Sequence, residues 1–317
     1  MNPAELKAVV EYMESDRGVE REVIIRAIEL ALEGASERSG FDDDDLRIAI
    51  DRNTFQMKAF RKLSDGSEIE STPPNLGRIA AANAKQLIMQ KIRTAEKELI
   101  FDQYKDRVGD IVTGTVTRFE RSDVIIELDH GEAVLLGRER VPTEEYEIGE
   151  RVRAIILEVR EKERGTEIAL SRSHPDFVRS LFELEVSEIS DNTMEIKGIA
   201  REAGYRSKVA VYSNDERVDP VGACVGMRGM RVKNIVRELS GEKIDIVRWN
   251  DDIKVFITNA LAPARLKNVD VDEETRTVSV IVDPDQLSLA IGKRGQNARL
   301  TSKLTGWRVD VQKDEES

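Results

Sequence analysis

The chain has 317 residues, of which 40% are apolar and 35% charged, so we expect two to four folded domains. Asp and Glu outnumber Lys and Arg by 61 to 49, and the net charge of −12 excludes a protein that coats phosphate nonspecifically. The single cysteine, Cys224, excludes an intramolecular disulfide and favours a reducing compartment. No run has the length of a membrane span or the pattern of a signal peptide, so we expect a cytoplasmic protein without membrane contact.

The first part of the chain, residues 1–105, is predicted to form a mixed α/β domain. Apolar periodicity and turn signals predict two helices and then two strands, over 3–14, 19–38, 46–51 and 55–63. The acidic run 42–45 is interpreted as a solvated loop, because adjacent carboxylates in a loop rarely hold a metal ion. Pro73-Pro74 interrupts the chain before a long helix over 76–104, which we expect to link this domain to the next.

From Val108 onwards the apolar period changes to two, which indicates β-strands. Five strands are predicted, over 111–119, 124–128, 133–136, 151–160 and 167–171. Five short strands in succession are typical of a small closed β-barrel with the OB-fold. The opening run 109–114 and the closing run 170–172 resemble those of an S1-type RNA-binding barrel, which we assign to residues 106–174.

Barrels of this type bind RNA through exposed aromatic and basic side chains on their strands. The candidates here are Arg118, Phe119, Arg121 and His130. Phe119 could instead belong to the core, and His130 could cap a turn, so both alternatives stay open at this point.

The stretch from 175 to 312 contains the same order of elements twice: helix, strand, strand, helix, helix, strand. In the first copy these elements are predicted over 174–184, 194–203, 207–214, 220–225, 230–239 and 243–249. In the second copy they are predicted over 251–261, 266–272, 277–283, 285–291, 296–304 and 307–312. The repeated αββααβ unit is typical of type II KH domains. We assign two tandem KH domains to residues 175–249 and 250–317, which makes the chain a multidomain α+β protein.

Each KH unit has a loop of two glycines around two other residues, at 226–229 and 292–295. Glycine lets another backbone approach closely, and the helix that follows offers free N–H groups to a phosphate. A KH domain clamps four single-stranded nucleotides beside such a loop. The candidate RNA contacts are Gly226, Met227, Arg228, Gly229, Arg231 and Lys233 in the first unit and Gly292, Lys293, Arg294, Gly295, Gln296 and Arg299 in the second.

Several longer runs are specific enough to compare with known families. The most specific is Val-Asp-Pro-Val-Gly-Ala-Cys-Val-Gly at 218–226, and the others lie at 78–81, 91–93, 170–175, 209–214, 241–247 and 290–297. Together they resemble the NusA family of bacterial transcription factors over essentially the whole chain. Some members of that family carry acidic carboxy-terminal repeats that block the RNA-binding face. Because this sequence ends at Ser317, we expect no self-inhibition of that kind.

The resemblance implies that residues 1–105 dock on RNA polymerase at the flap of the β subunit, near the RNA exit channel. It implies that the barrel and the KH domains receive nascent single-stranded RNA there, in pausing, intrinsic termination and antitermination. Other Nus factors and ribosomal proteins are expected partners in antitermination complexes. Docking raises the effective concentration of weak RNA-binding modules beside the transcript, which explains how an acidic protein can act on RNA. We expect a monomer without catalytic residues, cofactor or metal.

Two other classes of function are open from the sequence. KH and S1-type domains also accompany exoribonucleases, but a nuclease needs clustered carboxylates or a phosphate pocket in a catalytic domain. The first hundred residues contain no histidine and no cysteine, His130 and His174 lie in different domains, and Cys224 lies in an apolar helix where a structural thiol is expected. The other class is a ribosome-associated KH protein, which binding of purified RNA polymerase would distinguish.

Overall fold

The fold is described from a computed structural model, which describes residues 3–17, 20–38, 46–62, 67–71, 97–162 and 165–314. The chain divides into two compact units, Met1–Asp106 with Val159–Glu167 and Arg107–Glu158 with Ile168–Ser317. Within the described ranges, no helix is both long and apolar enough to cross a membrane.

The first unit contains two helices and a three-stranded antiparallel sheet. Its elements are α1 (Pro3–Arg17), α2 (Arg21–Arg38), β1 (Leu46–Ile50), β2 (Met57–Lys62) and β3 (Glu68–Glu70). Leu6 and Val10 of α1 and Ile24 and Ile28 of α2 bury their side chains against the sheet, where Ile48 lies in the same core. The two helices and two strands predicted here are confirmed. The third strand was not predicted, because its three residues are all exposed and Ile69 alone gives no apolar period.

Three predictions for the first domain fall wholly or largely outside the described residues. The acidic run 42–45 and Pro73-Pro74 lie outside them, as does most of the helix predicted over 76–104. Residues 97–104, the end of that predicted helix, are helical.

The S1-type region is a closed five-stranded barrel, as predicted. Its strands are β4 (Ile111–Glu120), β5 (Asp123–Glu127), β6 (Glu132–Leu135), β7 (Arg151–Lys162) and β8 (Gly165–Ser171). They follow the order β4-β5-β6-β8-β7, and antiparallel pairing of β4 with β7 closes the barrel. Side chains alternate along β4, with Val112 and Val116 buried. A Cβ on Gly114 would lie 2.5 Å from the carbonyl oxygen of Glu127, so glycine permits the close approach of β4 and β5.

The two KH units have the predicted αββααβ order. The first contains α4 (Pro175–Glu185), the short α5 (Ser187–Ser190), β9 (Met194–Glu202), β10 (Arg206–Ser213), α6 (Pro220–Val225), α7 (Met230–Glu238) and β11 (Lys243–Arg248). The second contains α8 (Ile253–Leu261), β12 (Asn268–Asp272), β13 (Thr277–Val282), α9 (Leu287–Ile291), α10 (Gln296–Thr305) and β14 (Arg308–Lys313). In each sheet the middle strand pairs antiparallel with the first and parallel with the third, so the repeat in the sequence is a repeat in the fold.

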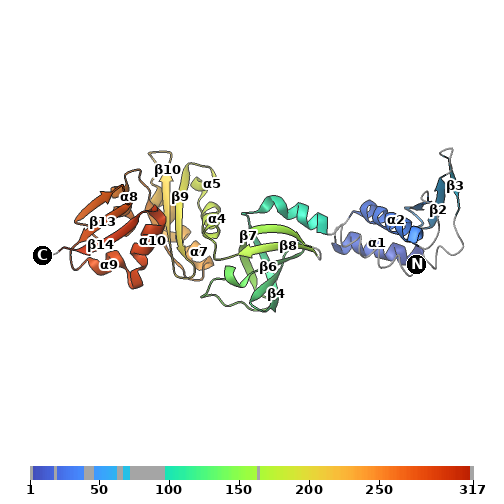
Figure 1. The fold of residues 1–317 in the computed structure, drawn as a ribbon, viewed down its shortest axis with the longest axis horizontal. Helices are drawn as coiled ribbons and strands as arrows, with labels where there is room; N and C mark the ends of the chain where they lie inside the picture. The colour runs from blue at the N-terminus through green and yellow to red at the C-terminus, as the bar shows by residue number, and fades with distance from the viewer. Residues whose placement is uncertain are drawn as a thin grey trace. The chain divides into compact units, whose positions relative to one another are not determined.

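The sheet of the first KH unit is buried on both faces. Val209 and Val211 of β10 pack with the helices of their own unit, in a core that also contains Phe177 and Phe182. On the opposite face, Ala210 packs in a second cluster with residues of α8. Figure 1 shows α10 beside β9, and these two elements are in contact. The second KH unit therefore covers the sheet of the first.

Candidate nucleic-acid interface

The two glycine-bounded loops have the same backbone conformation. The φ and ψ angles are 70° and 175° at Gly226 and 75° and 171° at Gly292. They are 54° and 23° at Arg228 and 57° and 28° at Arg294. A positive φ is uncommon and strained for a residue other than glycine. Both loops thus hold an arginine in the same strained conformation at the same position.

The first glycine of each loop is required by both its backbone angles and the space around it. A Cβ on Gly226 would lie 2.8 Å from the side chain of Arg231, and one on Gly292 would lie 2.8 Å from the backbone nitrogen of Asn297. The last glycine differs, because a Cβ on Gly295 would meet no atom within 4 Å. Only its positive φ of 72° favours glycine there.

The helix that follows each loop begins without a capping side chain. The helices α4, α6 and α8 start at His174, Asp219 and Asp252, whose side chains accept hydrogen bonds from first-turn N–H groups. The helices α7 and α10 start at Gly229 and Gly295, which have no side-chain oxygen to accept such bonds. The positive end of each helix dipole and its first-turn N–H groups therefore face the loop without a competing side-chain acceptor.

In each unit, a cationic side chain of the helix after the loop donates a hydrogen bond to a carbonyl oxygen of the loop. The Nζ of Lys233 donates a hydrogen bond to the carbonyl oxygen of Arg228 at 3.2 Å. At the corresponding position, Nη1 of Arg299 donates to the carbonyl oxygen of Arg294 at 3.1 Å. These two candidate RNA contacts thus also stabilise the strained arginine of their own loop.

Three cations at the loop tips are available to a ligand. The side chains of Arg228, Lys293 and Arg294 are exposed and have no hydrogen-bond or ion-pair partner in the part of the chain that the structure describes. Met227 precedes Arg228 and is 84% exposed. Arg231 is different, because Glu188 accepts from its Nη1 at 2.9 Å and the carbonyl oxygen of Ala223 accepts at 2.8 Å.

The barrel candidates do not form a single cluster. Arg121 lies in the turn before β5 and His130 lies in the loop after it, so the two are at opposite ends of that strand. Phe119 is 41% exposed, so the alternative that it belongs to the core is wrong. His130 is exposed and its side chain makes no hydrogen bond with the described residues, so the alternative that it caps a turn is also wrong. Arg118 is bound by carboxylates, with Nε 2.9 Å from Glu120 and a two-point contact to Glu132.

Comparison with known families assigns each of these regions. Four family models match successive parts of the chain: the NusA N-terminal domain at 5–64 and 62–98, the S1 RNA binding domain at 105–173, the NusA-like first KH domain at 172–249 and the NusA-like second KH domain at 253–317. The chain belongs to the NusA family. The resemblance seen in the sequence is therefore confirmed.

Curated members of the NusA family match along nearly their whole length, and each is named transcription termination/antitermination protein NusA. The relative from Halalkalibacterium halodurans is 42% identical over 96% of this chain and 87% of its own. The relative from Bacillus subtilis is 41% identical, over 98% and 91%. The relative from Mycobacterium tuberculosis is 43% identical, over 97% and 92%. Their name is that of a transcription factor, which decides against the exoribonuclease alternative.

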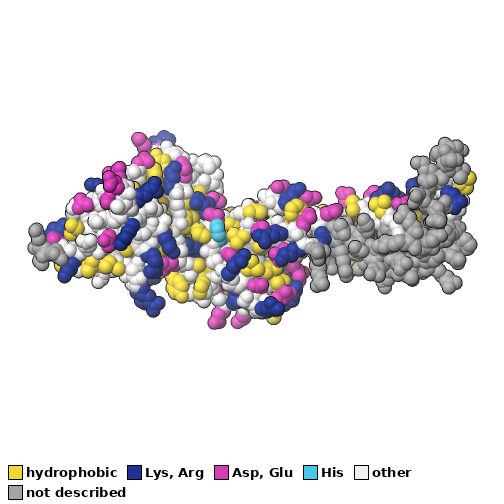
Figure 2. Space-filling view, viewed as in Figure 1, with side chains coloured by type: hydrophobic (Ala, Val, Ile, Leu, Met, Phe, Trp, Pro, Cys, Tyr) yellow, Lys and Arg dark blue, Asp and Glu magenta, His cyan; other side chains and the backbone are white. Residues whose placement is uncertain are grey.

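The structure also describes the environment of Cys224 and the placement of the charged side chains. Burial raises the pKa of the Cys224 thiol to about 12, so this group stays protonated, as expected for a structural cysteine. Among residues 3–17, 20–38, 46–62, 67–71, 97–162 and 165–314, no group of three or more His, Cys, Asp and Glu side chains is placed to hold a metal ion. On the face drawn in Figure 2, Lys and Arg side chains of the KH units and barrel are spread among Asp and Glu.

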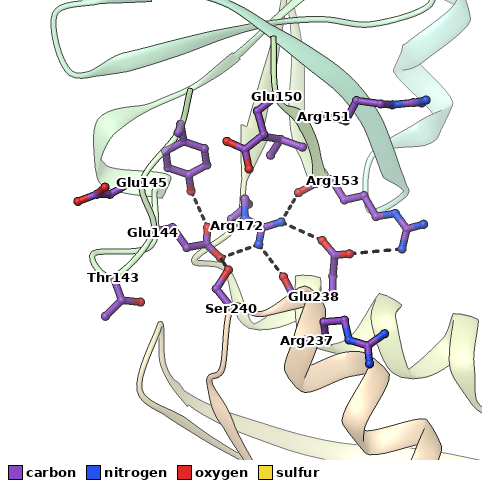
Figure 3. A pocket seen from close by; sticks show the side chains of 12 residues that line it. Thr143, Glu144, Glu145, Glu150, Arg151, Arg153, Arg172, Arg237, Glu238 and Ser240 are labelled. Atoms are coloured by element: carbon purple, nitrogen blue, oxygen red, sulfur yellow. Dashed lines mark hydrogen bonds and ion pairs between the residues drawn. The ribbon is translucent and has the colours of Figure 1, made fainter. Parts of the chain in front are cut away.

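The sequence did not reveal the side chain that joins the barrel to the first KH unit of this NusA-family chain. Arg172 is 5% exposed, and its Nε and Nη2 each lie 2.6 Å from a carboxylate oxygen of Glu144. It also donates to the carbonyl oxygens of Arg153 at 2.6 Å and Glu238 at 2.8 Å. Figure 3 shows Arg172 at the centre of this network, beside a cavity of about 320 Å³. In the sequence this arginine was noted only as part of the run that ends the barrel.

Glu144 is ionised in this network. Burial alone would raise the pKa of its carboxyl group, but the hydrogen bonds and charge of Arg172 outweigh burial and hold the pKa below its ordinary value of 4.5. Tyr146 and Ser240 also donate to Glu144, at 2.7 and 3.0 Å. The joint between the barrel and the first KH unit is therefore a buried ionic network.

A buried lysine joins the two KH units. Lys208, in the middle of β10, is fully buried, and its Nζ lies 2.7 Å from the carbonyl oxygen of Ala260 in α8 and 3.0 Å from Asp245. Burial lowers the pKa of Lys208, although Asp245 opposes the shift. Lysine is rarely buried, so nothing in the sequence marked this position.

Proposed function

We propose that this chain is a transcription factor that binds RNA polymerase and nascent single-stranded RNA, and that it acts on pausing, intrinsic termination and antitermination without catalysing a reaction. The pair of glycine-bounded loops with the same backbone conformation carries the proposal. Each places an exposed arginine and an uncapped helix N-terminus at the same point, which suits a phosphate of an RNA backbone. The curated relatives, all named for termination and antitermination, support the same function.

The RNA-binding residues that we propose form two groups. Met227, Arg228, Lys293 and Arg294 contact RNA directly, together with the backbone of the four loop glycines. Arg231, Lys233, Gln296 and Arg299 act at the flanks, because each also holds a contact within the protein. On the barrel, the exposed side chains of Phe119, Arg121 and His130 are proposed to contact further parts of the RNA. Arg118 is proposed as a contact as well, although Glu120 and Glu132 bind its guanidinium.

The N-terminal residues 1–105 are proposed to dock on RNA polymerase, at the β-subunit flap near the RNA exit channel. With residues 106–174 as the barrel and 175–249 and 250–317 as the KH domains, docking holds three weak RNA-binding domains beside the emerging transcript. The effective concentration of RNA is then high enough for a chain of net charge −12. We place the protein in the cytoplasm, as a monomer that meets other Nus factors and ribosomal proteins in antitermination complexes.

Crosslinking of the full chain within a paused transcription complex tests this proposal. We expect crosslinks from residues 1–105 to the β subunit and from both glycine-bounded loops to the nascent RNA. Crosslinks from the loops to ribosomal RNA alone, with no binding of purified RNA polymerase, would instead support the ribosome-associated alternative.

A further inference from the structure

Glu202 is the last residue of β9 in the first KH unit, but its side chain binds the second KH unit. Its Oε1 lies 2.6 Å from Nε of Arg299, and its Oε2 lies 2.8 Å from Nε2 of Gln296. Gln296 and Arg299 belong to the first turns of α10, directly after the second glycine-bounded loop. The contact thus joins the body of one KH unit to the RNA-binding end of the other.

Arg299 extends this contact into the loop itself. While its Nε donates to Glu202, its Nη1 donates to the carbonyl oxygen of Arg294 at 3.1 Å. An uninterrupted series of contacts therefore runs from the carboxylate of Glu202, through the guanidinium of Arg299, to the residue that holds a positive φ in the loop. A guanidinium is planar and fixed in shape, so the position of the carboxylate determines where the other N–H groups point.

The first loop lacks such a contact from outside its own unit. Lys233, which corresponds to Arg299, holds the carbonyl oxygen of Arg228 but has no carboxylate partner among the residues that the structure describes. The two loops have the same backbone, so the difference lies in what supports them. The first loop is supported by its own helix, and the second is supported by the neighbouring KH unit as well.

The contact with Glu202 leaves part of Arg299 available. The arginine side chain is 48% exposed, whereas that of Glu202 is 19% exposed. Glu202 accepts from Nε and Arg294 accepts from Nη1, while the N–H groups of Nη2 have no partner in the described part of the chain. The hydrogen bond from Arg299, with the help of Gln296, lowers the pKa of Glu202 against the effect of burial, so the pair is ionised at neutral pH. Two of the three guanidinium nitrogens thus hold Arg299 in one orientation, and the N–H groups of the third, Nη2, can bind a ligand.

We propose that Glu202 is a positioning residue for RNA binding: it orients Arg299 so that the second loop is held ready to bind only while the first KH unit is packed beside it. The inference rests on the proposed function, because it assumes that the second loop binds RNA. It makes the second loop depend on the first KH unit rather than act as an independent site. The opposite role, an internal anion that competes with RNA phosphate for Arg299, is the other outcome of the test.

Glu202→Ala in the full chain tests the proposal, with Glu195→Ala as the matched control. Glu195 lies on the same strand, but its carboxylate binds Lys197 at 2.8 Å and contacts Asn214, and it touches neither glycine-bounded loop. The probe is a fluorescently labelled, unstructured RNA of about 12 nucleotides, long enough for both KH units at four nucleotides each. We expect Glu202→Ala to weaken binding by about threefold to tenfold, in the range of pairwise couplings within a network. Glu195→Ala should leave the affinity unchanged.

A double-mutant cycle shows whether Glu202 acts through Arg299. In a chain that carries Arg299→Ala, the change Glu202→Ala should cause no further loss of RNA affinity. A purely structural role would lower the melting temperature and reduce affinity equally in both backgrounds. Additive losses, or unchanged affinity in the Glu202→Ala single variant, would overturn the proposal. Tighter binding with a steeper salt dependence would also overturn it and would establish competition instead.

Failure of the inference can be told from failure of the proposed function. The variant Lys293→Asp with Arg294→Asp removes both cations of the second loop. If this variant binds RNA weakly while Glu202→Ala binds like the wild type, the second loop is an RNA site and only the role of Glu202 is wrong. If the double variant binds as tightly as the wild type, the second loop is not an RNA site and the inference fails with it.

Discussion

The two KH units share a backbone but differ in the side chains that they place on it. Their loops agree within a few degrees at corresponding residues, yet the first presents Met227 and Arg228 where the second presents Lys293 and Arg294. Their sheets differ too, because Lys208 at the centre of the first is buried by the second unit, whereas Ser279 at the corresponding position is only partly buried. The two units thus share the backbone of the glycine-bounded loop, but their sheets differ in how deeply they are buried.

The largest expected effect concerns the covered sheet. Lys208→Ala opens a cavity in the covered sheet and leaves the carbonyl oxygen of Ala260 unpaired, while Arg206 still binds Asp245. The free energy of unfolding should fall by about 3–5 kcal/mol. Ser279→Ala at the corresponding position should change it by less than about 0.5 kcal/mol. Chemical denaturation of both variants measures the difference. Equal changes in the free energy of unfolding would show that burial of the first sheet by the second KH unit does not make Lys208 more important than Ser279.

The next effect compares the two glycines of one loop. Gly292→Ala places a Cβ 2.8 Å from the backbone of Asn297 at φ and ψ angles that only glycine adopts readily, and should cost about 3 kcal/mol. Gly295→Ala meets no neighbouring atom and should cost about 1 kcal/mol through its positive φ alone. Thermal unfolding of both variants checks the order. A larger loss of stability for Gly295→Ala would mean that the space around each glycine is not what requires glycine in this loop.

Most of the fold could be predicted from the sequence, but less of the candidate nucleic-acid interface could be predicted. Alternation and helical spacing indicated the barrel and both KH units, because their strands and helices each bury one regular face. The exposed strand β3 offered no such face and was missed. Proximity to a loop identified Arg231 and Arg299, yet proximity could not show that their partners, Glu188 and Glu202, lie 43 and 97 residues before them. Those ion pairs exist only in the folded chain.

The side chains of the two loops should give different salt dependences. Met227→Lys gives the first loop the same pair of cations as the second. Each added phosphate contact on single-stranded RNA should steepen the slope of log K against log salt by about 0.7. Titrations of a single-stranded RNA at several salt concentrations measure this slope. An unchanged slope would show that position 227 does not reach a phosphate.

The smallest expected effect concerns the joint between the barrel and the first KH unit. The folded pKa of Glu144 lies below the unfolded value of 4.5, so Glu144 stabilises the fold above pH 4.5 and loses this contribution as the pH falls through the folded pKa. The stability difference between the wild type and Glu144→Gln should therefore shrink as the pH drops below 4.5. Denaturation at a series of acidic pH values measures it. A difference that stays constant would show that Glu144 is not ionised against Arg172.

The most direct test of the account is RNA binding after charge reversal at the second loop. Lys293→Asp with Arg294→Asp should weaken binding of an unstructured RNA by more than about tenfold, because two phosphate contacts become repulsive. Arg308→Asp with Lys313→Asp makes the same change in net charge on the exposed strand β14 and should weaken it by about twofold at most. If both variants lose affinity equally, only the overall charge matters, and the second glycine-bounded loop is not where the chain holds RNA.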